Sequence, residues 1–191
     1  MTITCNKCIL SLYRTKIVNG NGNNPSDIMI IGEAPGKDED IQGKPFVGKS
    51  GIFLRKCLNG IGLNNSNCYI TNVIKCRPPG NRVPEYKELI SCLPHLINEI
   101  KTVNPKFILL LGSTANKTLL ETDSSIHRLR LENRIIKDYN ISSTYHPSYI
   151  LRNKDFLQSF IDDLVKFINL YIDYNPLHQI NSNILNNLMS G

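Results

Sequence analysis

Tryptophan is absent from this chain of 191 residues, alanine occurs only at Ala34 and Ala115, and long hydrophobic runs are missing. No apolar run reaches the roughly 18 residues that a membrane-spanning helix needs, so we expect no membrane span. The first residues, MTITCNKC, lack the basic and then apolar layout of a secretory signal. We therefore expect an intracellular protein whose cysteines do not form disulfides.

The composition that remains is that of a folded domain with a basic surface. Hydrophobic residues make up 41% of the chain, which is enough to build a core at this length. Lys and Arg number 22 against 16 Asp and Glu, a net charge of +6 that favours an anionic partner such as nucleic acid. We predict one domain over residues 1–173 and a C-terminal extension over residues 174–191.

Short apolar runs alternate with segments of helical periodicity along the chain. The runs predict four strands, at residues 27–32, 68–73, 107–112 and 141–145. Helices are expected at residues 47–60, from Pro84 onwards, after Ser113 as N-cap, and in a long final segment around residues 156–171. This order predicts an α/β fold of three layers, α/β/α, with a central, mainly parallel four-stranded sheet.

Polar and glycine-rich segments follow each of these strands. They are GEAPG at 32–36, Thr71-Asn72, Gly112-Ser113 and His146-Pro147-Ser148. Because the carboxyl ends of parallel strands line the binding crevice of such a sheet, we expect these segments to form one site.

Four of the six cysteines have a spacing that indicates a metal centre. Cys5 and Cys8 form a CxxC pair, whereas Cys76 lies in a Pro- and Gly-rich loop and Cys92 on the following helix. One tight pair and two scattered cysteines suit an iron–sulfur cluster somewhat better than a zinc ribbon, and the spacing leaves both open. The other two cysteines, Cys57 and Cys68, lie at ordinary apolar positions.

Three motifs in this order resemble the family 4 uracil-DNA glycosylases. They are GEAPGKDEDIQGKPFVGKSG (32–51), YITNVIKCRPPGNRVP (69–84) and TYHPSYILRN (144–153), and the resemblance covers roughly residues 5–170. It implies a uracil-DNA glycosylase fold and a monofunctional repair enzyme that hydrolyses the N-glycosidic bond of uracil in single- or double-stranded DNA. It also implies a 4Fe–4S cluster, which in this family is held by the residues that match Cys5, Cys8, Cys76 and Cys92.

The resemblance assigns roles to residues at the strand ends. Phe46 corresponds to the aromatic floor on which the flipped base stacks, and Asn72 to the amide that reads its Watson–Crick edge. His146 would donate a hydrogen bond to uracil O2 as negative charge grows there. Gly32 and Ala34 belong to the loop that lines the pocket.

The carboxylate that positions the water is less clear from the sequence. In the best-known uracil glycosylases an Asp stands where this chain has Ala34. Glu33 and Glu39 are therefore the candidates for orienting water or facing the sugar cation. The alternative for residues 38–40 is a solvated acidic turn without a catalytic task.

The third motif predicts the contact with DNA. Ser148 can bind a phosphate, and Tyr149, Ile150 or Leu151 could wedge into the space that the flipped base leaves. Arg152 contributes charge on the same rim, together with Lys49, Arg77 and Arg82. We expect salt-sensitive binding with little sequence preference.

The sequence leaves two alternatives open. The chain could be a non-catalytic DNA-binding or scaffolding member of the same fold within a replication or repair complex. The extension over residues 174–191 has apolar residues at helical spacing, so it is either a terminal helix folded onto the domain or a docking helix for a replication or repair protein.

Overall fold

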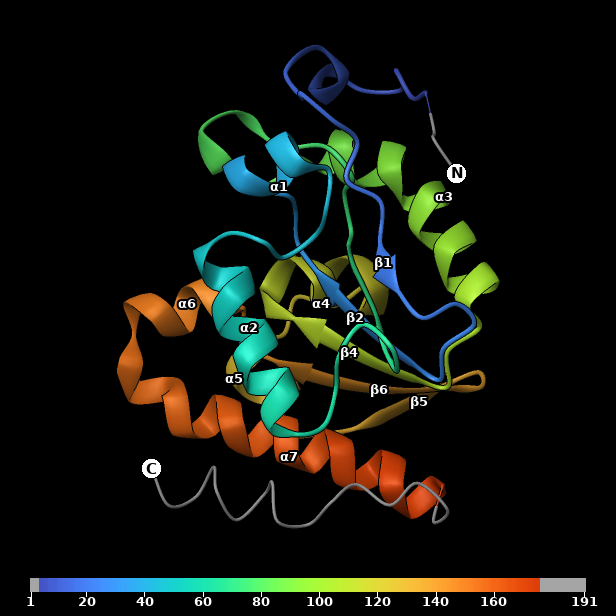
Figure 1. Cartoon of the computed structure of the whole chain (residues 1–191), viewed down its shortest axis with the longest axis vertical. Helices are drawn as coiled ribbons and strands as arrows, with labels where there is room; N and C mark the ends of the chain where they lie inside the picture. The colour runs from blue at the N-terminus through green and yellow to red at the C-terminus, as the bar shows by residue number, and fades with distance from the viewer. Residues whose placement is uncertain (1–3, 176–191) are drawn as a thin grey trace.

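The computed structural model describes residues 4–175 and contains one six-stranded sheet between two layers of helices (Figure 1). The strand order is β1-β3-β2-β4-β6-β5. The strands span Asn21–Gly22 (β1), Ile28–Gly32 (β2), Tyr69–Asn72 (β3), Phe107–Leu111 (β4), Arg134–Ile136 (β5) and Tyr139–Thr144 (β6).

The four predicted strands are β2, β3, β4 and β6, and they are parallel neighbours in the sheet. The prediction of a four-stranded sheet is nevertheless incomplete, because β1 and β5 add an antiparallel strand at each edge. Both are too short, at two and three residues, to leave a hydrophobic period in the sequence. The three-layer α/β/α prediction is confirmed.

The described residues contain seven α-helices, of which the last two follow the final strand. They are Lys37–Gln42 (α1), Lys49–Gly60 (α2), Tyr86–Val103 (α3), Gly112–Leu120 (α4), Ile126–Leu129 (α5), Pro147–Arg152 (α6) and Leu157–Tyr174 (α7). Short 3-10 turns lie at Ile9–Leu12 (η1), Pro79–Asn81 (η2) and Lys154–Phe156 (η3).

Two predicted helix starts are wrong. The helix expected from Pro84 begins at Tyr86, because the Glu88 carboxylate accepts a hydrogen bond from the Glu85 N–H at 2.8 Å and fixes the start there. Ser113 is not an N-cap, since α4 already begins at Gly112 and leaves Ser113 in its first turn.

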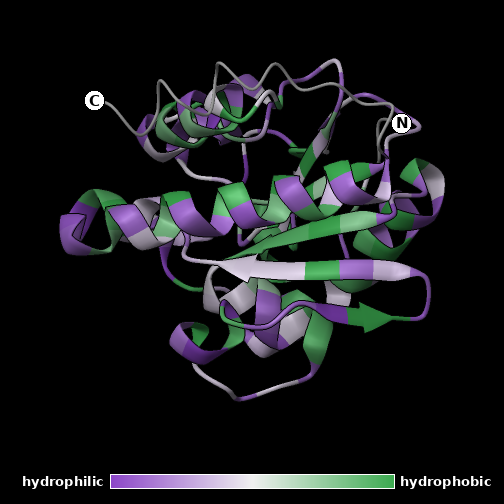
Figure 2. Cartoon of the chain, turned by 90° about the horizontal axis from the view of Figure 1, so that it is seen from below, coloured by the Kyte–Doolittle hydropathy of each residue, from purple (hydrophilic) through white to green (hydrophobic). Residues whose placement is uncertain are grey.

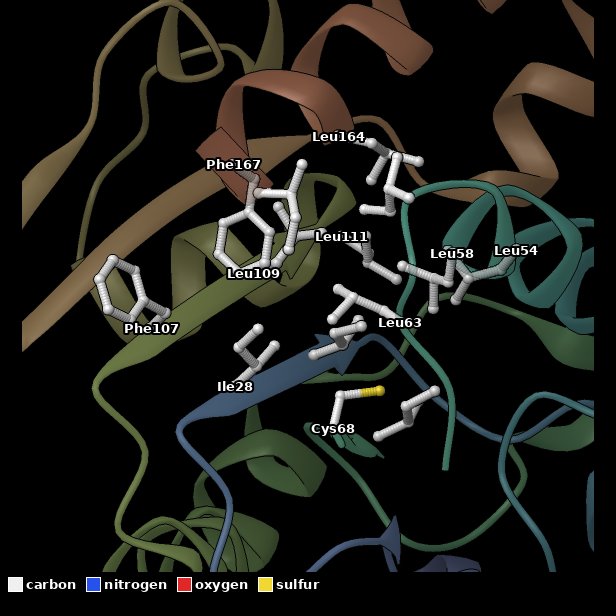
Figure 3. Close-up of a cluster of buried hydrophobic side chains, with 14 of the residues drawn as sticks. Ile28, Leu54, Leu58, Leu63, Cys68, Phe107, Leu109, Leu111, Leu164 and Phe167 are labelled. Carbon is white, nitrogen blue, oxygen red and sulfur yellow. The ribbon is translucent and has the colours of Figure 1, made fainter. Parts of the chain in front are cut away.

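The sheet separates two hydrophobic clusters. On one face, β2 and β4 pack against α2, α6 and α7, through residues that include Ile28, Leu109, Leu58 and Phe167 (Figure 3). On the other face, alternate residues of the same strands pack against α3 and α4. Strands buried on both faces explain the continuous apolar runs of the sequence.

The last helix, α7, is amphipathic, and Figure 2 shows hydrophobic and hydrophilic residues alternating along it. Its C-terminal end packs on the sheet, where the rings of Tyr171 and Tyr174 lie edge-on to Phe107. The described chain contains no helix with the length and hydropathy that crossing a membrane requires. The predicted docking segment lies almost entirely outside the described residues.

The topology places the expected site at one end of the sheet. The chain runs from β2 to β3 on one side and then crosses to β4 on the other side of β2. The carboxyl end of β2 is therefore the point at which the winding reverses, where parallel sheets form their binding crevices. The GEAPG loop starts there.

Candidate active site and four-cysteine site

The loop after β2 is fastened to the end of β3. The Val73 N–H donates to the Gly32 carbonyl at 2.9 Å, and the Ile74 N–H donates to the Glu33 carbonyl at 3.2 Å. These bonds continue the parallel pairing in which Gly32 is the partner of Asn72. The first and second motifs therefore meet in one rigid corner.

Two predicted site residues pack closely against the backbone of Gly32. A Cβ atom on Gly32 would lie 2.5 Å from Cζ of Phe46 and 2.6 Å from Oδ1 of Asn72. Both distances are far below a van der Waals contact, so a side chain at this position would displace Phe46 or Asn72. Phe46 and Asn72 thus approach the same point from different segments.

Asn72 presents an unusual polar atom at this point. Its side chain is 2% exposed, and its Oδ1 has no hydrogen-bond partner within the described part of the chain. Burying an amide oxygen without a partner costs free energy, so such an atom requires an explanation. An amide that binds a ligand's N–H explains it.

His146 adds a donor beside the Phe46 ring. The two ring centroids are 6.3 Å apart with an interplanar angle of 33°. His146 is the N-cap of α6, and its Nδ1 accepts from the Ser148 N–H at 3.2 Å. A ring nitrogen that accepts this bond carries no proton, so the proton of the neutral ring is on Nε2.

The protonation state of His146 follows from its surroundings. Burial lowers its pKa to about 4, and the positive charge of Arg152 acts in the same direction. The imidazole is therefore neutral at physiological pH, with a single N–H donor at Nε2.

The first loop also holds two of the other predicted residues. Thr114, in the first turn of α4, donates its hydroxyl to Oε2 of Glu33. Ala34 is half-buried and packs against the α3–α4 side of the core. Glu33 thus has a fixed orientation at the edge of the corner, and the position of Ala34 offers no carboxylate.

The Glu39 carboxylate is bound to the backbone of the first motif, next to Phe46. Its Oε1 accepts from the N–H groups of Val47 and Gly48 at 2.9 and 2.8 Å, and its Oε2 from Gly36 at 3.1 Å. Both oxygens thus accept hydrogen bonds from backbone N–H groups, which fixes the orientation of the carboxylate. The alternative of a solvated acidic turn is wrong for Glu39 and Asp40, which are buried, whereas Asp38 is exposed.

The DNA-contact residues divide by exposure. Ile150 is 2% exposed in the core, so it cannot serve as a wedge, whereas Leu151 is 43% exposed. Tyr149 stacks on Tyr145 with a centroid distance of 5.4 Å and is half-buried. The short helix α6 turns Leu151 outward, and the sequence did not reveal which of its faces is buried.

Two further rim residues have partners in the protein. The Ser148 hydroxyl lies 2.8 Å from Nδ1 of His146, which ties it to the catalytic candidate. The Arg82 guanidinium contacts both carboxylate oxygens of the buried Glu88, at 2.6 and 2.9 Å. Its charge is therefore compensated, whereas Arg152 and Lys49 are exposed.

All four predicted ligand cysteines line one pocket. Cys5 and Cys8 approach it from the N-terminal segment, Cys76 from the loop after β3, and Cys92 from α3. The remaining two cysteines lie elsewhere, with Cys68 in the core on the other side of the sheet. The structure thus brings together the four cysteines that the sequence singled out.

Donors surround these sulfur atoms. Arg14 Nη1 donates to the Cys76 Sγ at 3.2 Å, and the Lys75 N–H donates to the Cys92 Sγ at 3.3 Å. Burial raises the pKa of the Cys76 thiol, and the hydrogen bond from Arg14 opposes this effect. Burial also raises the pKa of Cys92, to about 11.

Several residues that shape the two sites were not found from the sequence. Arg14 and His95 contact cysteine sulfurs, Lys75 reaches the carbonyl of Asn72, and Arg55 binds the backbone at Phe46. Each of these side chains contacts either a residue that is distant in the sequence or a backbone group. The one sequence signal was their position near a motif.

Comparisons with known proteins agree with this geometry. Residues 19–167 match the family described as the uracil DNA glycosylase superfamily. A type-4 uracil-DNA glycosylase from Thermotoga maritima is 40% identical over 153 residues, which are 78% of this chain and 79% of that protein. One from Sulfurisphaera tokodaii is 38% identical over 179 residues, covering 89% and 81%.

A different kind of protein also matches. A DNA polymerase from Bacillus phage SP01 is 26% identical over 156 residues, which are 81% of this chain and 17% of the polymerase. The similarity to the glycosylases is higher and extends over most of both chains. This chain belongs to the uracil DNA glycosylase superfamily and, within it, to the type-4 uracil-DNA glycosylases.

Proposed function

We propose that this protein excises uracil from DNA by hydrolysing the N-glycosidic bond of a flipped-out nucleotide, leaving an abasic site. The observation that carries the proposal is the buried, unpaired Oδ1 of Asn72 among the described residues, placed beside Gly32 and the Phe46 ring. Each feature suits a planar base that enters edge-first and stacks on an aromatic floor.

Asn72 supplies the reading of the base. Uracil presents an N3–H donor and an O4 acceptor, which pair with the oxygen and the nitrogen of one amide. Cytosine presents the opposite pattern at these positions, so it would leave Oδ1 of Asn72 facing an acceptor. The cost of unpaired buried groups then provides the discrimination.

His146 supplies stabilisation of the leaving group. As the glycosidic bond breaks, the electron pair stays on uracil and negative charge grows on O2. The Nε2–H of the neutral His146 ring is the donor for that oxygen, held in place through Nδ1 by Ser148. Water then adds to the sugar cation and loses a proton; we assign Glu33, oriented by Thr114, as the carboxylate that accepts this proton, which finally neutralises the departing uracil anion.

Binding to DNA depends on the rim around this pocket. We assign the wedge to Leu151, and phosphate contacts to Ser148 and Arg152. These contacts carry no base information, so affinity should fall steeply with salt and vary little with sequence. The enzyme accordingly acts in a DNA-containing compartment of the cell.

The four-cysteine pocket fits a 4Fe–4S cluster. Among residues 4–175, no group of three or more His, Cys, Asp or Glu side chains is placed so that it could hold a single metal ion. A cubane cluster instead takes one thiolate at each of four corners, and Cys5, Cys8, Cys76 and Cys92 line a shared pocket. Arg14 and the Lys75 N–H would stabilise thiolate charge there. When bound, the cluster supplies a structural link between the N-terminal segment, the Cys76 loop and α3.

The test of the activity uses oligonucleotides with one uracil, single- and double-stranded, followed by alkaline cleavage. We expect strand scission by the wild type, and losses of about 100-fold or more in Asn72→Ala and His146→Ala. Asn59→Ala, an exposed asparagine on α2, is the matched control and should retain full activity. A wild type that cleaves neither substrate would overturn the proposal and favour a non-catalytic, DNA-binding protein.

A replication partner is a second proposal, supported by the phage DNA polymerase that contains a segment similar to this chain. We assign the docking to residues 174–191. Deletion of residues 176–191 should leave excision of short oligonucleotides intact and abolish co-purification with a DNA polymerase from the same cells. Co-purification that survives the deletion would contradict this assignment.

A further inference from the structure

Phe46 holds its ring in place with a strained backbone. Its φ is +55°, in the left-handed region where the Cβ of a non-glycine residue crowds the following carbonyl. Such a conformation persists only when the surrounding structure holds it. The ring meets the pocket from this backbone, so whatever holds the backbone also sets the floor of the site.

Arg55, on α2, donates hydrogen bonds to the carbonyl groups of this segment. Its Nε donates to the Phe46 carbonyl at 2.9 Å, and its Nη2 donates to the Pro45 carbonyl at 3.0 Å. Nη1 donates to Oδ1 of Asn65 at 2.7 Å. All three nitrogens bind protein groups, which distinguishes Arg55 from a phosphate-binding arginine on the surface.

Glu39 accepts hydrogen bonds from the backbone N–H groups of the same segment. One of its oxygens accepts from the N–H groups of Val47 and Gly48. The first turn of α2 presses on the same backbone, since a Cβ on Gly51 would lie 2.1 Å from the carbonyl carbon of Phe46. A cation thus holds the carbonyls, an anion holds the amides, and a glycine permits the close approach.

We propose that Arg55 is a positioning residue for base recognition, which acts by fixing the left-handed backbone of Phe46 and so the place of its ring. The inference rests on the proposed function, because the ring is the floor for uracil only in that case. The planar guanidinium is needed, since its fork reaches two successive carbonyls at once and an ammonium reaches one.

A double-mutant cycle tests the proposal. Arg55→Met should lower kcat/KM for uracil-containing DNA by about 10- to 100-fold, the cost of a misplaced contact group. In a Phe46→Leu background the same change should cost less than about 2-fold, because the ring that Arg55 positions is gone. Arg55→Lys should lie between Met and the wild type. Equal losses in both backgrounds would overturn the proposal.

Two matched controls separate positioning by Arg55 from a loss of charge or of its third contact. Lys56→Met removes a neighbouring positive charge that is exposed. It should leave kcat/KM within about 2-fold of the wild type. A fall as large as that of Arg55→Met would indicate a general effect of charge on DNA binding. Asn65→Ala removes the third partner of Arg55 without touching the Phe46 segment and should also be neutral.

A second measurement is independent of catalysis. The chain has no tryptophan, so Phe46→Trp introduces a single indole at the floor of the pocket. Adding Arg55→Met should increase its quenching by acrylamide, and Arg55→Lys should increase it less. Unchanged quenching in both would overturn the proposal. A wild type without glycosylase activity would refute the proposed function alone, and the quenching would still decide whether Arg55 holds residue 46. If Arg55→Met does not fold, Arg55→Lys carries both measurements.

Discussion

The ammonium group of Lys75 donates a hydrogen bond to the carbonyl of Asn72 at 2.7 Å. Its other two donors reach the hydroxyl of Thr71 at 2.7 Å and Oε2 of Glu99 at 2.6 Å. Lys75 is 2% exposed, so all three of its protons are used inside the protein. The backbone of the base-reading asparagine is therefore anchored by a buried ion pair between the end of β3 and α3.

Lys75→Met should impair both stability and excision. Removing the cation leaves the Glu99 carboxylate largely buried without its partner, which costs about 3 kcal/mol or more. It also removes the donor to the Asn72 carbonyl, and we expect kcat/KM to fall about 10-fold or more. Urea unfolding and single-turnover excision measure the two effects.

The double variant Lys75→Met/Glu99→Gln separates the effect on stability from the effect on excision. Without either charge, most of the stability should return, because no buried carboxylate is left uncompensated. Activity should stay low, since the Asn72 carbonyl still lacks its donor. Recovery of activity together with stability would contradict a positioning role of Lys75.

The motifs made the base-facing residues predictable, and the structure confirms that they come together. Gly32, Asn72 and His146 lie at or just after the ends of parallel strands, so the strand order predicted their meeting, whereas Phe46, between α1 and α2, was predicted from the resemblance. The four cysteines were predictable from their spacing and from the resemblance, and in the structure they approach one pocket from three segments.

The supporting residues could not be predicted, because their roles depend on packing. Glu39 and Glu33 are both acids near the first motif, and only the structure shows that Glu39 binds three amides while Glu33 faces Thr114. Lys75 and Glu99 are 24 positions apart. The burial of Ile150 depends on how a helix of six residues rests on the core.

Gly32→Ala should abolish excision while the fold survives. The backbone of Gly32 does not have a positive φ, so alanine is compatible with its conformation. Its methyl group, however, would lie 2.5 Å from Cζ of Phe46 and 2.6 Å from Oδ1 of Asn72, so it would displace the ring and the amide that we assign to base binding. We expect excision activity to fall about 100-fold or more. Added uracil should also no longer raise the melting temperature of the variant, because it no longer binds. Full activity would show that the base binds elsewhere.

Cys92→Ser and Cys68→Ser form a matched pair for the cluster. Both residues are buried cysteines, but only Cys92 lines the four-cysteine pocket. Protein purified without oxygen should contain about four irons per chain, with visible absorbance, and Cys92→Ser should lose most of both. Cys68→Ser should keep them. Equal iron content in both variants would contradict the assignment of Cys92 as a ligand.

Acid should destabilise the protein through His146. The pKa of this residue is lowered from 6.5 to about 4, mainly by burial, and it returns to its ordinary value in the unfolded chain. Between these values the unfolded chain binds a proton that the folded chain does not, so stability rises with pH and is lost as pH falls from about 6.5 to about 4. The contribution is at most about 3 kcal/mol.

Unfolding by urea at pH 7 and at pH 4.5 measures this dependence, with His146→Gln as the comparison. The variant has no imidazole to protonate, so its stability should fall less across this range than that of the wild type. Arg152→Gln removes the positive charge that helps to lower the pKa of His146, and its histidine should titrate at a higher pH in nuclear magnetic resonance spectra. A wild-type His146 that titrates near pH 6.5 would contradict the neutral Nε2–H donor on which the proposed leaving-group stabilisation depends.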